Sequence, residues 1–418
     1  MIQQADHRGS TAIVFAIILI DMLGFGIVMP VLPGLIMDLG HMPVDKAAVW
    51  AGWLGAGYAA LQFVFAPVIG NLSDRYGRRP VLLASLLGFG IDYLVMGLAP
   101  SLWWLVLGRL AAGITGASWT AGYAFIADVS PPEKRAANFG LMGMAFGFGF
   151  IFGPALGGLL GTIGPRIPFL AAAGLALANA LLGYFVLRES LAPENRRPFE
   201  WRRANAFSAL GALRRQSGKV AWFIAATGFW MLAHVVYPAM WSYVAIAAWH
   251  YDSKAIGLAL AVVGISSALV QGLGLRLVAP RLGERLAVTI GVASFAVSAV
   301  LYTLAGSTLA IYVAILVGGL QGFISPSISA LASRAIDAKS QGELQGATQA
   351  VGSIAAIIGP PLYALVFESF HGPAAITELP TMPFLVAAGF AAIALLLFLR
   401  GTAGVSVGAA EPAPADRS

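Results

Sequence analysis

The chain contains twelve apolar windows, each long enough to cross a lipid bilayer as a helix. A helix needs roughly 20 residues to span the ~30 Å hydrocarbon core of a bilayer. The chain is also 59% apolar and only 11% charged, which leaves too little polar surface to cover a water-soluble globule. The sequence therefore predicts an all-α membrane protein with twelve transmembrane helices. The windows lie at about 11–36, 48–70, 81–99, 102–127, 136–161, 167–187, 220–247, 254–278, 286–305, 308–332, 344–367 and 381–400.

Lys and Arg are unevenly distributed between the segments that separate these windows. Twelve crossings place both termini on one side of the membrane, together with every second loop. This set of segments holds 21 of the 25 cations, and the opposite set holds three, Lys46, Arg166 and Lys254. Because loops rich in Lys and Arg remain in the cytoplasm, we expect both termini to be cytoplasmic. The role of the cations in setting the orientation in the membrane then explains the net charge of +6. We therefore expect no nucleic-acid partner.

Composition also bears on several classes of site. The absence of Cys excludes disulfide frameworks, thiolate metal sites and cysteine nucleophiles. The five His residues form no ligand-like cluster in the sequence, and no GxxxxGK loop followed by Ser or Thr occurs. We therefore expect neither a metal nor a cofactor, and we do not expect an enzyme.

A repeat with a constant spacing divides the chain into two related halves. The segment LSDRYGRRP (72–80) corresponds to VAPRLGERL (278–286), and Gly153-Pro154 corresponds to Gly359-Pro360, both at an offset of 206 residues. Two landmarks at one offset indicate duplication of a six-helix unit, which is a transporter architecture. The predicted parts are an N-terminal six-helix bundle (1–187), a cytoplasmic linker (188–219) with a short surface helix around Ala204–Arg215, a C-terminal six-helix bundle (220–400) and a disordered cytoplasmic tail (401–418).

Three motifs in the first half resemble those of a known family. The segments GNLSDRYGRRP (70–80), LGRLAAGITGA (107–117) and GFGFIFGPALGG (147–158) resemble the loop, helix 4 and helix 5 signatures of the major facilitator superfamily. The stretches IDMLGFGIVMPVLP (20–33) and YAFIADVSPPEKRAANFG (123–140) look like those of bacterial tetracycline efflux proteins and their relatives. The resemblance implies a drug:proton antiporter of a bacterial inner membrane, with two pseudo-symmetric bundles that work by alternating access.

The second half departs from that family at two positions. Tetracycline exporters carry a functional His in helix 8, where this chain has Ser267. They also carry an acidic residue in helix 9, which is replaced near Phe295. The resemblance therefore does not specify the substrate.

Three charged residues lie inside predicted helices: Asp21, Asp92 and Arg109. A charged group near the bilayer centre costs about 2.5–3.5 kcal/mol on insertion scales, so each needs a partner or a wet cavity. A carboxyl group withdrawn from water favours its neutral form, which suits a proton carrier. We expect these residues to perform proton coupling, with one acid as the proton site and the other paired with Arg109. Asp21 is the first choice for the central cavity, and a structural role is the alternative for the others.

The loop after the second window places an acid among three arginines. Asp74 precedes Arg75, Arg78 and Arg79, and Asp128 at the end of helix 4 is a candidate partner for Arg78. A carboxylate that faces arginines forms charge-assisted hydrogen bonds. We expect these residues to form a conformational latch, and the resemblance implies that Asp74 holds helices across the interface between the halves. The alternative is a solvated loop that only sets the topology.

The fifth window contains glycine at every fourth residue. Gly149, Gly153 and Gly157, with Pro154 among them, allow close helix packing and a kink. The resemblance implies that this segment seals against the opposite half. Ordinary tight packing is the alternative, and the two do not exclude each other.

Seven aromatic and polar residues are candidates for the lining of a substrate cavity. Such a lining suits amphipathic or aromatic substrates. The candidates are Trp119, Tyr123, His234, Tyr237, Trp241, Gln271 and Gln321.

These features predict a secondary active transporter that exports small amphipathic organic compounds in exchange for protons. Its expected partners are the organic substrate, protons and the lipid bilayer, and it is expected to act as a monomer. The alternative is a proton-coupled symporter that imports a small metabolite. Export is favoured because the resemblance associates the helix 5 signature with antiporters.

Overall fold

The computed structural model describes residues 2–116, 118–201, 205–206, 211, 218–337 and 340–403. Within these residues every regular element is helical, and no strand occurs. This confirms the predicted all-α class. Most of the expected surface helix around 204–215 and nearly all of the predicted tail at 401–418 lie outside the described residues.

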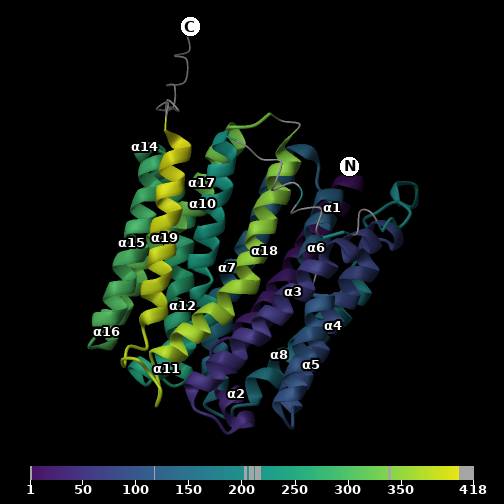
Figure 1. Ribbon diagram of the computed structural model, residues 1–418. Coiled ribbons are helices and arrows are strands. Elements are labelled where there is room, and N and C mark those ends of the chain that lie inside the picture. The colour runs from purple at the N-terminus through teal and green to yellow at the C-terminus, as the bar shows by residue number, and fades with distance from the viewer. Residues whose placement is uncertain are drawn as a thin grey trace. The chain divides into compact units, whose positions relative to one another are not determined.

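Helices occupy all twelve predicted windows (Figure 1). In the first half they are α1 (Ile2–Val28), α2 (Leu32–Gly40), α3 (Val44–Tyr76), α4 (Arg78–Leu98), α5 (Leu102–Thr115), α6 (Ser118–Val129), α7 (Pro132–Gly161), α8 (Ile167–Val186) and the short turn η1 (Pro193–Asn195). In the second half they are α10 (Gly218–His234), α11 (Val236–Trp249), α12 (Ser253–Leu269), η2 (Val270–Gly274), α13 (Leu275–Leu277), α14 (Ala279–Leu282), α15 (Glu284–Leu304), α16 (Thr308–Gly318), η3 (Gly319–Phe323), α17 (Ile324–Arg334), α18 (Gln341–Ser369) and α19 (Met382–Thr402).

Ten helical segments among the described residues are long and apolar enough to cross a membrane. An eleventh crossing is made if Ile13–Val28 and Leu32–Gly40, which bend by 47° at their junction, form one broken span. The remaining window contains α5, of 14 residues, followed by α6. The chain is thus a multi-pass membrane protein, consistent with the predicted twelve helices.

The helix breaks follow from local chemistry. α1 ends at Val28, two residues before Pro30, and proline disfavours helical backbone at the residue that precedes it. Pro33 then lies in the first turn of α2, where its missing N–H group has no cost. Between α3 and α4 the chain turns at Gly77, whose φ of +109° is unfavourable for residues with a side chain.

Compact packing divides the chain into two units. The first comprises Met1–Ser208, Val235–Gly264 and Ala356–Pro383. The second comprises Ala209–His234, Ile265–Ala355 and Phe384–Ser418. Segments of α11, α12 and α18 thus group with the first eight helices, and the division into bundles at 1–187 and 220–400 stays a prediction.

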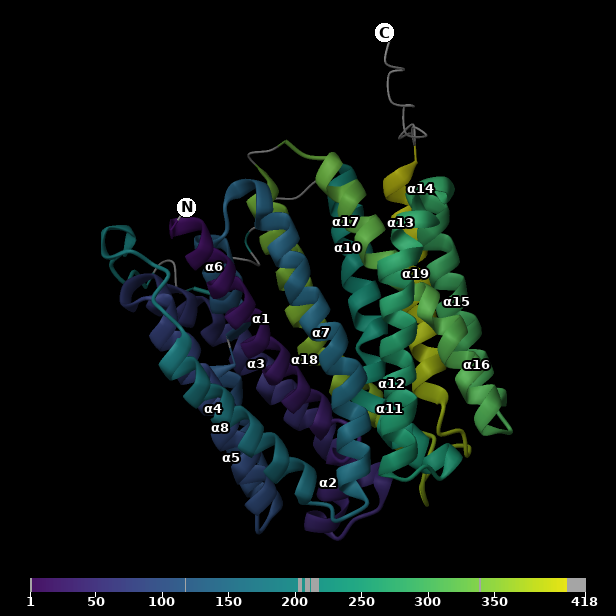
Figure 2. The ribbon, with the colours of Figure 1, turned by 180° about the vertical axis from the view of Figure 1, so that it is seen from behind.

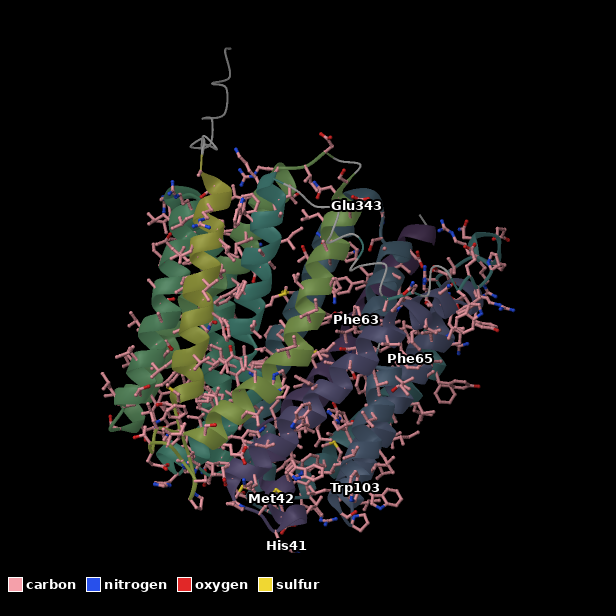
Figure 3. All side chains as sticks on the ribbon, in the orientation of Figure 1. His41, Met42, Phe63, Phe65, Trp103 and Glu343 are labelled. Carbon is pink, nitrogen blue, oxygen red and sulfur yellow. The ribbon has the colours of Figure 1, made fainter. Side chains whose placement is uncertain are left out.

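In the first unit α1 packs against α7 and α8, while α4 packs against α8 and α3 against α5. Figures 1 and 2 show these helices running side by side. Figure 3 shows His41, Met42 and Trp103 at the end of this unit where α2 approaches the start of α5. Since α3 begins at Val44 and ends at Tyr76, the loop with the three arginines lies at the opposite end.

In the second unit α15 packs against α16, η3 and α17. Trp230 of α10 contacts both α17 and α15. Its Nε1 donates a hydrogen bond to Ser325 Oγ at 3.0 Å, and its ring lies edge-on to Phe295, with centroids 5.3 Å apart. Phe295 is fully buried, so its ring is part of the apolar core of this unit.

Candidate functional site

Asp92 and Arg109 form an ion pair between α4 and α5. Arg109 Nε donates to Asp92 Oδ1 at 3.4 Å, and its Nη2 contacts Asp92 Oδ2. Asp92 is only 2% exposed. Gly108 leaves the room for this carboxylate, since a β-carbon at Gly108 would lie 2.8 Å from Asp92 Oδ1. The pair therefore neutralises both charges inside the first unit.

Asp21 of α1 has a different environment. It is 8% exposed, and among the described residues its carboxylate has no hydrogen-bond or ion-pair partner. It lines a cavity of about 160 Å³ with side chains from four helices. The other lining residues are Met22, Phe25, Tyr58, Phe89, Tyr93 and Phe146. Asp21 is thus the single acidic group of an otherwise aromatic and apolar cavity.

Two tyrosines connect the cavity with the ion pair. Tyr58 and Tyr93 line the cavity, and the Arg109 guanidinium carbon lies 5.7 Å and 5.9 Å from the centroids of their rings. The sequence left open which of the two acids pairs with Arg109. In the structure Asp92 binds Arg109, and Asp21 faces the cavity. Asp21, Asp92 and Arg109 are therefore parts of one neighbourhood.

The aromatic lining of this cavity was not predicted from the sequence. Phe25, Tyr58, Phe89, Tyr93 and Phe146 are not among the seven candidates for the substrate cavity. One signal was present, because Phe25 lies four residues after Asp21, and Phe89 lies four residues before Tyr93, on the same helix faces. The rings of Phe89 and Tyr93 indeed stack, with centroids 6.4 Å apart.

The loop between α3 and α4 forms a network around Arg78. Arg78 Nη1 donates to Asp74 Oδ1 at 2.6 Å and to Ser73 Oγ at 3.2 Å, and its Nε donates to Asp128 Oδ2 at 3.2 Å. Asp128 also accepts a hydrogen bond from Ser190 Oγ at 3.2 Å. One guanidinium thus connects α3, α4 and α6. The role of Asp74 as a latch between the halves stays a prediction.

The other two arginines of this loop contact aromatic rings. The Arg79 guanidinium carbon lies 5.5 Å from the centroid of Tyr184, and Nη2 donates to the Tyr184 carbonyl oxygen at 2.7 Å. The Arg75 guanidinium carbon lies 5.1 Å from the centroid of Tyr76.

Glu189 caps the start of α4 and was not predicted. Its carboxylate accepts hydrogen bonds from the backbone N–H groups of Arg78, at 2.8 Å, and Arg79, at 3.3 Å. The same carboxylate accepts from the N–H groups of Ser190 and Leu191, both at 3.0 Å. An acid at a helix N-terminus satisfies free donors and opposes the helix dipole. Because Glu189 follows Arg78 by 111 residues, no local pattern indicates this contact.

The glycines at 149, 153 and 157 of α7 pack against α1. A β-carbon at Gly153 would lie 2.7 Å from Gly26 Cα, and one at Gly26 would lie 2.9 Å from Gly153 Cα. A β-carbon at Gly149 would lie 2.8 Å from the carbonyl carbon of Met22, and one at Gly157 would lie 2.8 Å from Ile27 Cα. These three glycines therefore allow the backbones of α1 and α7 to pack closely together.

A second face of α7 approaches α12, which belongs to the second half of the chain. A β-carbon at Gly257 would lie 3.0 Å from Gly158 Cα and would overlap the Pro154 carbonyl oxygen. Farther along, a β-carbon at Gly264 would lie 3.2 Å from Ile151 Cα. Contact with the other half is thus made by Pro154, Gly158 and Ile151, and the three stripe glycines face α1.

α3 also contacts the last part of α18 within the first unit. Lys46 Nζ forms an ion pair with Glu368 Oε1. A β-carbon at Gly52 would lie 2.8 Å from Ala364 Cβ and 3.1 Å from Pro361 Cα. These contacts hold α3 and the last part of α18 together at the end of the unit near Met42.

The predicted substrate-lining residues are distributed over both units. Trp241 on α11 is 1% exposed, and its ring centroid lies 5.7 Å from that of Trp249. Tyr123 packs on Phe139, with centroids 5.6 Å apart. Tyr237 also belongs to the first unit. The side chain of Trp119 lies outside the described part of the chain.

The other three candidates belong to the second unit. The His234 ring lies 5.6 Å from the ring of Trp230. Gln271 lies in η2 and is exposed, and Gln321 lies in η3. A cavity shared by all seven candidates stays a prediction.

Comparison with known proteins identifies the family. The family model of the Major Facilitator Superfamily matches residues 14–360 and 223–416. The chain is 41% identical over 359 residues to the tetracycline resistance protein, class C, of Escherichia coli, which covers 85% of this chain and 89% of that protein. It is 36% identical over 373 residues to the tetracycline resistance protein, class G, of Vibrio anguillarum, with coverage of 87% and 92%.

The fold is shared with solved transporters. The crystal structure of the nucleoside transporter NupG matches with a TM-score of 0.75 at 13% identity, and the match covers 94% of this chain and 99% of that one. At this identity the likeness concerns the fold alone. The family model and the relatives span most of the chain and show that it belongs to the major facilitator superfamily. The relatives of this chain within that superfamily include tetracycline resistance proteins.

Proposed function

We propose that this protein is a secondary active transporter that exports small amphipathic organic compounds in exchange for protons. The observation that carries the proposal is the carboxylate of Asp21, which is buried in a cavity lined by aromatic rings and has no partner among the described residues. An isolated charge is unfavourable inside a membrane protein, so this group gains from binding either a proton or a cationic ligand. The tetracycline resistance proteins among the relatives support a drug as the exported compound.

The neighbouring residues have separate roles in this proposal. Asp21 is the proton carrier, because Asp92 is already bound to Arg109. Arg109 lies beside Tyr58 and Tyr93, so it supports two rings of the cavity wall. The Asp92–Arg109 pair therefore positions the cavity wall without adding a net charge to it.

The arrangement of charge supports an orientation in the membrane. The end of the first unit near Gly77 carries Arg75, Arg78 and Arg79, and Arg197 lies beside them, because its backbone N–H donates to the Asp74 carbonyl oxygen. The cations of the opposite set of loops are Lys46, Arg166 and Lys254. In a bacterial inner membrane the first end would face the cytoplasm, together with both termini.

Alternating access would involve contacts at both ends of the first unit. The network of Asp74, Arg78 and Asp128 would act as the cytoplasmic latch. The ion pair of Lys46 with Glu368 would close the periplasmic end. The close approach of α7 to α12 at Gly158 and Gly257 would limit leakage through the transporter. The bundles 1–187 and 220–400 of a single monomer would move relative to each other around the substrate.

Proteoliposomes with an imposed pH gradient test this function. Tetracycline and a fluorescent amphipathic amine serve as probes. An acidic lumen should drive accumulation of a transported probe by antiport, whereas an acidic exterior should not. Asp21→Asn should abolish this accumulation, and Asp38→Asn, a matched change of an exposed acid on α2, should preserve it.

The opposite response identifies the alternative. Accumulation driven by an acidic exterior would show a symporter that imports its substrate. Flux that does not respond to either gradient would show a uniporter and would refute proton coupling.

A further inference from the structure

We infer that Glu284 and Arg334 form a positioning contact of the second half, the α17 clamp, which fixes the tilt of α17 during transport. Its part in transport rests on the proposed function. Three features of the second unit support the clamp: the place of the pair in the repeat, a helix break beside it and the polarity of its charges.

The pair occupies the positions of the Arg78–Asp128 pair of the first half. Arg78 corresponds to Glu284, and Asp128 corresponds to Arg334, at the same offset of 206 residues that relates the two halves. Arg334 Nη2 binds Glu284 Oε1, just as Arg78 Nε binds Asp128 Oδ2. The contact is thus retained in both halves, while its two charges are exchanged.

The backbone around the pair is repeated as well. α4 begins at Arg78 and α15 begins at Glu284, and both helices are 21 residues long. The preceding residues, Gly77 and Gly283, have φ angles of +109° and +74°, a conformation that favours glycine. The same turn therefore places residues 78 and 284 at equivalent helix starts, which makes their contacts comparable.

Each pair holds the second segment of an interrupted helix. In the first half α5 ends at Thr115 and α6 begins at Ser118. In the second half α16 passes into the 3-10 segment η3 (Gly319–Phe323) before α17 begins. A 3-10 stretch inside a longer helix often acts as a hinge. Arg334 is the last residue of α17, so its contact with Glu284 limits how far α17 can tilt about η3.

The charges of the α17 clamp agree with the helix dipoles. Glu284 lies in the first turn of α15, and Arg334 lies in the last turn of α17. A carboxylate is stabilised at a helix N-terminus and a cation at a C-terminus. Arg78 and Asp128 lie at the corresponding ends of α4 and α6 with the opposite signs, so the first pair opposes the dipoles of its helices.

Further acids compensate for this opposition in the first half. Arg78 also binds Asp74, and Glu189 accepts hydrogen bonds from the backbone N–H groups at the start of α4. In the second half Pro280, which carries no charge, stands at the position that corresponds to Asp74. One acid and one cation therefore suffice for the α17 clamp, because the helix dipoles favour their polarity.

The exposure of the clamp separates its role from a contribution to stability. The side chains of Arg334 and Glu284 are 60% and 27% exposed. Ion pairs in contact with water contribute little to stability, because the solvent screens their charges. Loss of the clamp should therefore change the tilt of α17 and leave the unfolding temperature nearly unchanged.

Charge-reversal variants test the clamp. Tetracycline accumulation driven by an acidic lumen is measured in proteoliposomes, relative to the amount of folded protein. Glu284→Arg and Arg334→Glu each bring two like charges together, and each should lower the maximal rate at least fivefold with little change in KM. Glu284→Arg/Arg334→Glu restores opposite charges and should transport at least threefold faster than either single variant. It should remain slower than the unchanged protein, because the exchanged charges oppose the dipoles.

Two controls accompany these variants. Glu343→Arg reverses an exposed acid at the start of α18 in the same unit and should retain transport. Arg78→Glu/Asp128→Arg should not recover transport, because a glutamate at position 78 would face Asp74 and Glu189. Full transport by both single variants of the α17 clamp, or a double variant no faster than they are, would overturn the inference.

Hydrogen exchange distinguishes failure of the clamp from failure of the proposed function. Backbone amides at 331–335 should exchange faster in either single variant than in the unchanged protein, and more slowly again in the double variant. Transport by the unchanged protein and by both single variants would overturn only the clamp. If the unchanged protein accumulated no tetracycline, proton-driven export of this drug would fail, and hydrogen exchange would still decide the contact. Equal exchange in all variants would then overturn it.

Discussion

Arg109 binds the carboxylate of Asp92 and at the same time lies over the rings of Tyr58 and Tyr93. One guanidinium thus neutralises a buried acid and borders the cavity of a second acid, Asp21, for which the described part of the chain supplies no counter-ion. The two carboxylates lie in the same part of the first unit and have opposite states of pairing. Asp92 is thus bound to Arg109, whereas Asp21 has no partner among the described residues.

The ion pair should behave as a unit when it is mutated. Asp92→Asn leaves the Arg109 charge buried without its partner, and such a change costs about 3–5 kcal/mol. Removing both charges in Asp92→Asn/Arg109→Gln should restore a large part of this stability, because no uncompensated charge remains. Thermal unfolding of the purified protein in detergent measures the effect. Additive losses in the double variant would show that the two residues do not interact.

The close packing of α1 and α7 should be sensitive to a single methyl group. Gly153→Ala places a β-carbon 2.7 Å from Gly26 Cα, where neither backbone has a flexible side chain that can move aside. Overpacking of this kind costs about 1–3 kcal/mol. Thermal unfolding should therefore occur at a lower temperature than in the unchanged protein.

Gly147 provides the control on the same helix. No heavy atom of the described residues lies within 4 Å of a β-carbon at Gly147, so Gly147→Ala should be neutral or should stabilise the helix by up to about 1 kcal/mol. If both variants lost stability equally, general helix propensity would explain the effect instead of contact with α1.

The positions of the helices were predictable because bilayer crossing imposes a length and a composition. The bend after Val28 was not predicted, since Pro30 and Pro33 lie inside one apolar window and hydropathy does not register a backbone break. The grouping of parts of α11, α12 and α18 with the first eight helices was not predicted either. It depends on contacts such as Gly257 with Gly158, which join residues far apart in the chain.

The charged members of the site were recognisable because a charge inside an apolar helix requires an explanation. Asp21, Asp92 and Arg109 stood out for this reason. Phe25 and Phe146 did not, because the chain contains 24 Phe residues and most apolar faces carry some of them. Only tertiary packing determines which rings surround Asp21. Glu189 was missed because its partners lie at the start of α4, and acids of a charged linker are usually solvated.

The network around Arg78 leads to a prediction about Asp74. Asp74→Asn removes the charge that accepts the 2.6 Å hydrogen bond from Arg78 and should abolish transport, while membrane insertion remains normal. Transport is measured in proteoliposomes, and insertion by the amount of folded protein in the membrane fraction. Glu194→Gln changes an exposed acid of η1 and should retain transport. Full transport by Asp74→Asn would refute the latch.

The contact between α3 and α18 can be tested by cross-linking. The chain has no Cys, so Lys46→Cys/Glu368→Cys introduces the only two thiols at the positions of the observed ion pair. A short bismaleimide should join these thiols and stop transport, because this end of the first unit could then no longer open. Each single-cysteine variant should retain transport after the same treatment, since one thiol cannot hold two helices together. Cross-linked protein that transports at the rate of untreated protein would show that this end stays closed throughout the cycle, and the ion pair would then be a fixed structural contact.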